Sequence, residues 1–86
     1  MATKVLDFWA PWCGPCQMMK PVMEEIEKEL EGKVEVEKIN VDENSAEAAK
    51  YGVMGIPTFV IIKDGKEVGR KVGFTPKSEL LKLING

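Results

Sequence analysis

The two cysteines of this 86-residue chain stand only three positions apart, in the string Trp12-Cys13-Gly14-Pro15-Cys16. An apolar run over residues 5–9 precedes the string, and a helical pattern of apolar residues follows it. The pair therefore lies where a predicted strand ends and a predicted helix begins. Sulfurs three residues apart on a first helical turn can form a disulfide with little backbone movement. This string predicts a strand–turn–helix unit with a redox-capable pair at its junction.

The rest of the chain alternates between strand and helix patterns. Apolar residues at three- and four-residue steps predict a helix from about Cys13 to Leu30, stopped by Gly32 and kinked by Pro21. On this helix Met18, Met19 and Met23 are interpreted as core residues and the Glu-rich stretch 24–31 as its solvated face. Further strands are predicted over residues 34–41, 59–62 and 67–72.

Capping and turn residues delimit the remaining elements. Asn44 with Glu47 predicts a capping box for a short helix over residues 45–51. Asp64-Gly65 predicts a tight hairpin, and Thr75 is expected to cap a last helix with Pro76 at its first position. The order β-α-β-α-β-β-α predicts one α/β domain over residues 1–86. Its four-stranded mixed sheet, flanked by helices, has a parallel pair first and an antiparallel hairpin last.

Composition excludes several classes of partner. The net charge is −2, with 12 basic and 14 acidic residues interspersed, so neither nucleic acid nor an anionic membrane is an expected partner. No apolar stretch is long enough for a membrane span, and the N-terminus does not have the pattern of a signal peptide. Two cysteines are too few for a disulfide-stapled secreted domain. These features predict a cytoplasmic protein.

The spacing of the cysteines favours redox chemistry over a structural role. The unpaired amides and positive end of a helix N-terminus stabilise a thiolate at Cys13, whereas Cys16 is expected to be less exposed and to act as the resolving thiol. A structural staple is the alternative, but closing a four-residue ring contributes only about 2 kcal/mol. A structural zinc site requires four ligands, and the chain has no histidine and no second cysteine pair. We therefore expect no metal.

One acidic residue stands out in the first predicted strand. Asp7 lies in the middle of the apolar run, where burial of its charge costs several kcal/mol. Desolvation is expected to raise the pKa of Asp7, so that it can accept the proton of Cys16. The alternative is that Asp7 lies at a strand edge and points to solvent.

Nearly the whole chain resembles the thioredoxin family. The resemblance is carried by the run from Val5 through the Trp-Cys-Gly-Pro-Cys string, together with Pro21, Lys38-Ile39-Asn40-Val41-Asp42, Tyr51-Gly52-Val53, Gly55-Ile56-Pro57-Thr58, Asp64-Gly65 and Val72-Gly73. It implies a minimal thioredoxin fold and a protein-disulfide reductase activity that uses the Cys13/Cys16 dithiol and no other cofactor. The implied partners are disulfide-containing proteins and a thioredoxin-reductase-like electron donor, and the protein is expected to be a monomer.

The resemblance also assigns roles to individual residues. It implies a cis peptide bond between Ile56 and Pro57, a buried proton-accepting Asp7 and a lysine partner, Lys38, for this acid. The implied substrate-binding residues are Trp12, Gly14, Pro15, Ile56, Pro57, Gly73 and Phe74.

Two departures from the family affect the expectations. The usual first strand and helix are missing, so the strand over residues 34–40 is expected to form an exposed sheet edge. Gln17 replaces a residue that is basic in many relatives. A glutaredoxin-like enzyme, a disulfide isomerase or oxidase, and a non-catalytic binding module on the same fold are the alternative functions.

Overall fold

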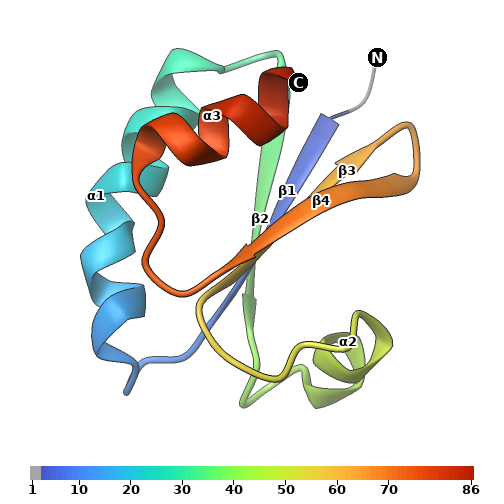
Figure 1. The fold of residues 1–86 in the computed structure, drawn as a ribbon. Coiled ribbons are helices and arrows are strands. Elements are labelled where there is room, and N and C mark those ends of the chain that lie inside the picture. The colour runs from blue at the N-terminus through green and yellow to red at the C-terminus, as the bar shows by residue number, and fades with distance from the viewer. Residues whose placement is uncertain (1–2) are drawn as a thin grey trace.

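The computed structural model describes residues 3–86, which form a four-stranded sheet and three helices (Figure 1). The order of elements matches the predicted β-α-β-α-β-β-α order. The elements are β1 (Thr3–Trp9), α1 (Gly14–Glu29), β2 (Val34–Asn40), α2 (Ser45–Lys50), β3 (Thr58–Lys63), β4 (Lys66–Val72) and α3 (Lys77–Asn85).

The sheet is mixed, as predicted. Its strand order is β2-β1-β3-β4, in which β1 pairs parallel with β2 and antiparallel with β3, and β4 runs antiparallel to β3. The parallel pair requires a crossover connection, which α1 supplies. Strand β2 lies at one edge, which confirms the exposed edge expected for residues 34–40.

The two faces of the sheet bury separate apolar clusters. Helices α1 and α3 cover one face, and α2 lies against the other (Figure 1). The α1/α3 face buries Val5, Met19, Met23, Ile26, Phe59, Ile61, Leu80 and Ile84. The α2 face buries Leu6, Phe8, Ile39 and Val60, with Tyr51 packed against Phe8 at a ring-centroid distance of 5.8 Å. Successive β1 residues thus enter opposite clusters, as the two-residue period of a strand requires.

These clusters, and not the disulfide, hold the fold together. Full burial of a Phe, Ile, Leu or Met side chain contributes about 1.5–3 kcal/mol. Phe59, Ile61 and Leu80 each have no exposed surface. One such residue already matches the roughly 2 kcal/mol expected from closing a four-residue ring, and two exceed it.

The two predicted helix caps have different outcomes: Asn44 is the N-cap residue of α2 but makes no capping hydrogen bond, and Thr75 is not the N-cap of α3. The Asn44 side chain makes no cap hydrogen bond to α2 but donates to the carbonyl of Asn40 over 3.1 Å. Thr75 donates its hydroxyl to the carbonyl of Gly73, so α3 starts at Lys77 with the extended Pro76 as its N-cap. In both cases a nearby backbone carbonyl competes successfully for the side chain.

Boundaries and burial along the chain differ from the predictions at a few points. Strand β1 starts at Thr3, two residues early, because Thr3 still has partners on both neighbouring strands. Other ends shift by a residue or so, as is usual at element ends. Helix α1 continues through Pro21. Met19 and Met23 are buried as predicted, whereas Met18 is exposed because the 100° step of the helix turns it away from the core.

The Glu-rich side of α1 is more than a solvated face. Glu25 and Glu29 form ion pairs with Lys77 of α3, and Glu27 forms one with Lys38 of β2. These pairs connect α1 to elements far away in the sequence.

Within residues 3–86, no helix has the length and apolar character that crossing a lipid bilayer requires.

Candidate active site

Cys13 and Cys16 form a disulfide at the N-terminus of α1. Cys13 is the N-cap of this helix, with an extended backbone, and its sulfur accepts the N–H of Cys16 over 3.2 Å. The N–H of Cys13 donates to the carbonyl of Ala10, also over 3.2 Å, which fixes the turn between β1 and α1. After reduction, the amide and the positive end of the helix face the Cys13 sulfur and favour its thiolate.

The disulfide is buried in a small apolar cluster. Ala10, Cys13 and Cys16 form this cluster, and Trp9, Val41 and Ile56 pack against it. Cys13 is 5% exposed and Cys16 6% exposed. The expectation that Cys16 is the less exposed of the two is therefore wrong in the disulfide form, because the bond holds both sulfurs in one apolar cluster.

Trp12 lies beside the disulfide and is 70% exposed, as expected for a residue that meets substrate. Its indole N–H donates to Oδ2 of Asp42 over 2.9 Å. Asp42 is itself fixed, because its backbone N–H donates to Oδ1 of Asn40 over 2.9 Å. No local pattern in the sequence distinguishes Asp42, since the pair joins residues thirty positions apart.

The peptide bond between Ile56 and Pro57 is cis, as predicted. The carbonyl of Pro57 accepts the N–H of Gly73 over 2.7 Å. Gly73 has a φ of +87°, a conformation that side-chain-bearing residues rarely adopt. Gly73 therefore allows the loop after β4 to turn against the cis-proline segment.

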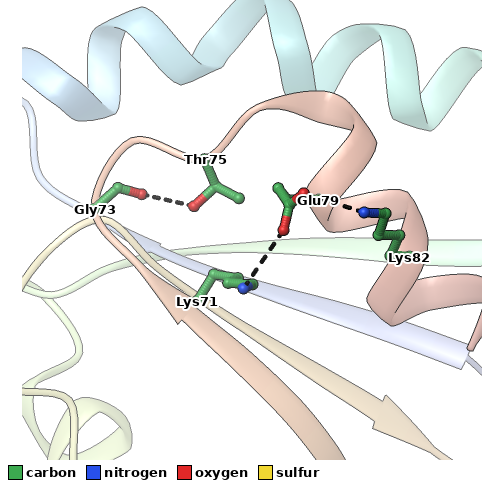
Figure 2. Close-up of polar contacts among 5 residues, drawn as sticks. All are labelled: Lys71, Gly73, Thr75, Glu79 and Lys82. Carbon is green, nitrogen blue, oxygen red and sulfur yellow. Dashed lines mark hydrogen bonds and ion pairs between the residues drawn. The ribbon is translucent and has the colours of Figure 1, made fainter.

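Side chains of α3 and β4 support this loop (Figure 2). The hydroxyl of Thr75 donates to the carbonyl of Gly73 over 3.0 Å, and Glu79 pairs with Lys71 at 3.8 Å and with Lys82 at 3.5 Å. The backbone N–H of Thr75 also lies 3.4 Å from the sulfur of Met19 in α1. These contacts fix the loop that carries Phe74, whose side chain is half exposed.

Exposed apolar side chains cluster along the segments that meet at the disulfide. Besides Trp12 and Phe74, Met54 is fully exposed and Val72 is largely exposed. A Cβ added at Gly55 would lie 3.6 Å from Val72, so the segment before Pro57 and the end of β4 are in contact. The exposure of Met54 and Val72 was not predicted from the sequence, because the exposure of an apolar residue in a loop or at a strand end depends on its tertiary neighbours.

Asp7 is buried beneath α1, as predicted. It is 7% exposed, and burial raises its pKa from 3.8 to about 6, with Lys38 opposing this rise and Glu27 adding to it. Asp7 has the same side-chain direction as Val5, which packs on Met19 and Met23 of α1. Asp7 is two residues closer than Val5 to the end of β1 that leads to Cys13, so it lies on the cysteine side of Val5 on this face of the sheet.

Lys38 and Glu27 complete the charged surroundings of Asp7. Lys38 is the register partner of Asp7 on the parallel strand β2, and its ammonium forms an ion pair with Glu27 at 3.6 Å. Lys38 was predicted from the sequence, whereas Glu27 was missed because it was assigned to the solvated face of α1.

Among residues 3–86, no group of three or more His, Cys, Asp or Glu side chains is placed to hold a metal ion.

Comparison with known proteins identifies the family. The thioredoxin family model matches residues 2–86. The chain is 56% identical over 79 residues to the thioredoxin of Bacillus subtilis (strain 168), an alignment that covers 92% of this chain and 76% of the relative. The chain belongs to the thioredoxin family. The resemblance inferred from the motifs is thereby confirmed.

Solved structures support the same assignment. A mutant thioredoxin from Halobacterium salinarum NRC-1 superposes with a TM-score of 0.89 at 44% identity, covering 96% of this chain and 72% of that one. A malarial protein at 29% identity superposes with a TM-score of 0.93 and covers 99% and 96% of the two chains. This thioredoxin-family chain has the predicted minimal fold, and it is a protein-disulfide oxidoreductase with Cys13–Cys16 as its redox-active disulfide.

Proposed function

We propose that Cys13 is the nucleophile and Cys16 the resolving thiol in the reduction of disulfides in other proteins. The observation that carries this assignment is the position of the Cys13 sulfur at the N-terminus of α1, where it accepts the N–H of Cys16. The same amide stabilises a thiolate on Cys13, which lowers its pKa and makes it the attacking sulfur. The backbone N–H of Cys16 thus activates Cys13. The Cys16 sulfur later forms the disulfide with Cys13.

The reaction takes place in two exchanges. The Cys13 thiolate attacks one sulfur of the substrate disulfide, forms a mixed disulfide, and releases the other substrate sulfur as a thiolate that takes a proton. The Cys16 thiol then loses its proton, and its sulfur attacks Cys13. The Cys13–Cys16 bond forms, and the second substrate sulfur leaves. Two electrons pass from the protein to the substrate, and a thioredoxin-reductase-like donor restores the dithiol.

Asp7 is proposed to accept the proton that Cys16 loses. A base works best when its pKa lies near the working pH, and burial brings the pKa of Asp7 to about 6. Lys38, its register partner on β2, opposes part of this rise. We assign Lys38 the role of stabilising the carboxylate before the proton arrives.

The surface around the disulfide suits protein substrates. Ile56 packs against the cysteines, and Pro57 is hydrogen-bonded to Gly73, which precedes the exposed Phe74. Trp12 precedes Cys13, and Gly14 and Pro15 separate the cysteines. Gly55, which follows the exposed Met54, approaches the exposed Val72. An apolar surface beside one reactive sulfur accommodates extended peptides of varied sequence. We propose that the protein acts as a monomer in the cytoplasm and takes no cofactor besides its own disulfide.

The equilibrium reduction potential of the Cys13–Cys16 pair distinguishes a reductase from the alternatives. We expect a value below the cytosolic glutathione poise, roughly −220 to −260 mV by extraction methods. The measurement is thiol trapping after equilibration with a defined dithiol buffer. A value near or above about −180 mV would instead identify an isomerase or oxidase.

Replacement of Trp12 by alanine tests the substrate surface. We expect kcat/KM for a protein substrate to fall about 5- to 10-fold, because an exposed aromatic contact of about 1 kcal/mol or slightly more is lost. Reduction of a small aromatic disulfide should change less than about twofold, since it needs little of this surface. Val68→Ala is the control, because Val68 is also exposed but lies within β4. Equal losses on both substrates would contradict a docking role for Trp12.

A further inference from the structure

Lys38 lies between two carboxylates of very different exposure. Asp7, its register partner on β1, is 7% exposed, whereas the Glu27 side chain on α1 is 41% exposed. The ammonium of Lys38 lies 3.6 Å from Oε1 of Glu27. Lys38 therefore connects a buried acid beneath the cysteines to a charged residue at the surface.

A water-accessible cleft lies at the Glu27 end of this arrangement. It has a volume of about 560 Å³ between α1 and β2, and its lining includes Glu24, Glu27, Val34 and Val36. Val36 precedes Lys38 by two residues on β2, so both side chains point toward the same face of the sheet. Lys38 does not line the cleft itself, but its ammonium is paired with Glu27, which does, so Glu27 holds the charged end of Lys38 at the edge of the cleft.

We propose that Glu27 is a positioning residue for the redox reaction, which anchors the Lys38 ammonium at the cleft and so keeps Asp7 fit to accept the Cys16 proton. This inference rests on the proposed role of Asp7. Without Glu27, Lys38 loses its ion-pair partner but keeps Asp7, its register partner, as a carboxylate on which it acts. A closer ammonium would stabilise the Asp7 carboxylate and make it a weaker base.

Among residues 3–86, the charged side chains that act on Asp7 in the oxidised protein are those of Lys38 and Glu27. Opposite Asp7, β3 places Phe59. From α1 come Glu27 and the two cysteines, which titrate only after reduction, and from β2 comes Lys38. In the oxidised protein, the pKa of Asp7 is therefore set by burial first, then by Lys38, which lowers it, and by Glu27, which raises it.

The alternative is an ordinary surface ion pair. Exposed pairs typically contribute little to stability and influence no distant chemistry. The two interpretations predict different effects on Asp7, a group that neither substrate nor electron donor needs to reach. The titration of Asp7 in the oxidised protein therefore separates them without an activity assay.

The first test compares Glu27→Gln with Glu24→Gln by carboxyl NMR titration of Asp7 in the oxidised protein. Both substitutions remove one negative charge from α1 beside the same cleft, but only Glu27 contributes to the pKa of Asp7. We expect Glu27→Gln to lower the pKa of Asp7 by about half a pH unit or more, and Glu24→Gln to shift it by less than half as much. Equal shifts in the two variants would overturn the proposal.

The second test asks whether Glu27 acts through Lys38. We expect Glu27→Gln to shift the pKa of Asp7 less than half as far in a Lys38→Met background as in the parent protein. The same shift in both backgrounds would mean that Glu27 acts only by its own charge, which would contradict a positioning role. Glu27→Asp should restore part of the original value, because it keeps the charge on a shorter side chain.

The consequence for the reaction is measured separately. Glu27→Gln should slow resolution of the mixed disulfide about twofold near neutral pH, because the proton acceptor becomes a weaker base. A reduction potential typical of an oxidase would refute the proposed reductase function but leave the Asp7 titration in the Glu27 variants unaffected. Conversely, an unshifted titration would refute only the role of Glu27.

Discussion

Replacing Cys13 with serine is expected to reduce the rate of protein-disulfide reduction by about 10³-fold or more. A serine hydroxyl at the N-cap of α1 remains protonated near neutral pH, so no nucleophile is left to attack the substrate. The remaining thiol, Cys16, lies inside the first turn of α1 and not at its N-cap, where the helix end stabilises a thiolate. The measurement is the initial rate of disulfide reduction in a protein substrate, with the dithiol background subtracted.

Cys16→Ser is the matched variant, and it should fail at a different step. Cys13 can still attack, but no second thiol is present to release the product, so a stable mixed disulfide should accumulate and be visible by mass spectrometry of the intact adduct. Cys13→Ser should form far less of this adduct. Equal trapping by the two variants, or rapid turnover by Cys13→Ser, would contradict the assigned order of attack.

Replacing Asp7 with asparagine should stabilise the oxidised protein by about 3 kcal/mol at pH 7 and above. The pKa of Asp7 rises from 3.8 to about 6 on folding, mainly because burial penalises its charge. The folded protein therefore binds this proton more tightly than the unfolded chain, and stability is lost as pH rises from about 3.8 through 6. Asparagine carries no charge to bury and avoids that loss.

Urea unfolding at two pH values tests this prediction. The stability advantage of Asp7→Asn should be close to zero near about pH 3.5 and approach its full value by about pH 7.5. Asp42→Asn is the control, because Asp42 is exposed and its substitution should show no comparable pH-dependent gain. An Asp7→Asn advantage of the same size at both pH values would mean that packing, and not the buried charge, is responsible.

The features that could be predicted from the sequence are those determined by residues close together in the chain. A Cys-Gly-Pro-Cys string between a strand and a helix fixes both the turn and the sulfur pair, and the structure places both there. An aspartate within an apolar strand must be buried or must disrupt the strand, and Asp7 is buried. The cis bond before Pro57 followed from the family resemblance, since an isolated Ile-Pro pair is far more often trans.

What the sequence could not indicate depends on contacts between distant segments. Glu27 and Lys38 belong to different elements, and an exposed glutamate on a helix looks the same whether or not a lysine faces it. Asp42 reaches Trp12 across thirty residues, and the exposure of Met54 depends on how its loop turns before Pro57. The departures from the predicted caps at Asn44 and Thr75 reflect competition among backbone carbonyls that periodicity does not reveal.

The small size of the disulfide ring affects how the fold responds to repeated oxidation and reduction. The bond joins residues three positions apart, so opening it releases only one helical turn and leaves both apolar clusters and the sheet in place. Each catalytic cycle thus passes through two folded states, and a reduced molecule that waits for a substrate is still a native one. Repeated turnover then adds nothing to the population of unfolded chains on which proteases and chaperones act.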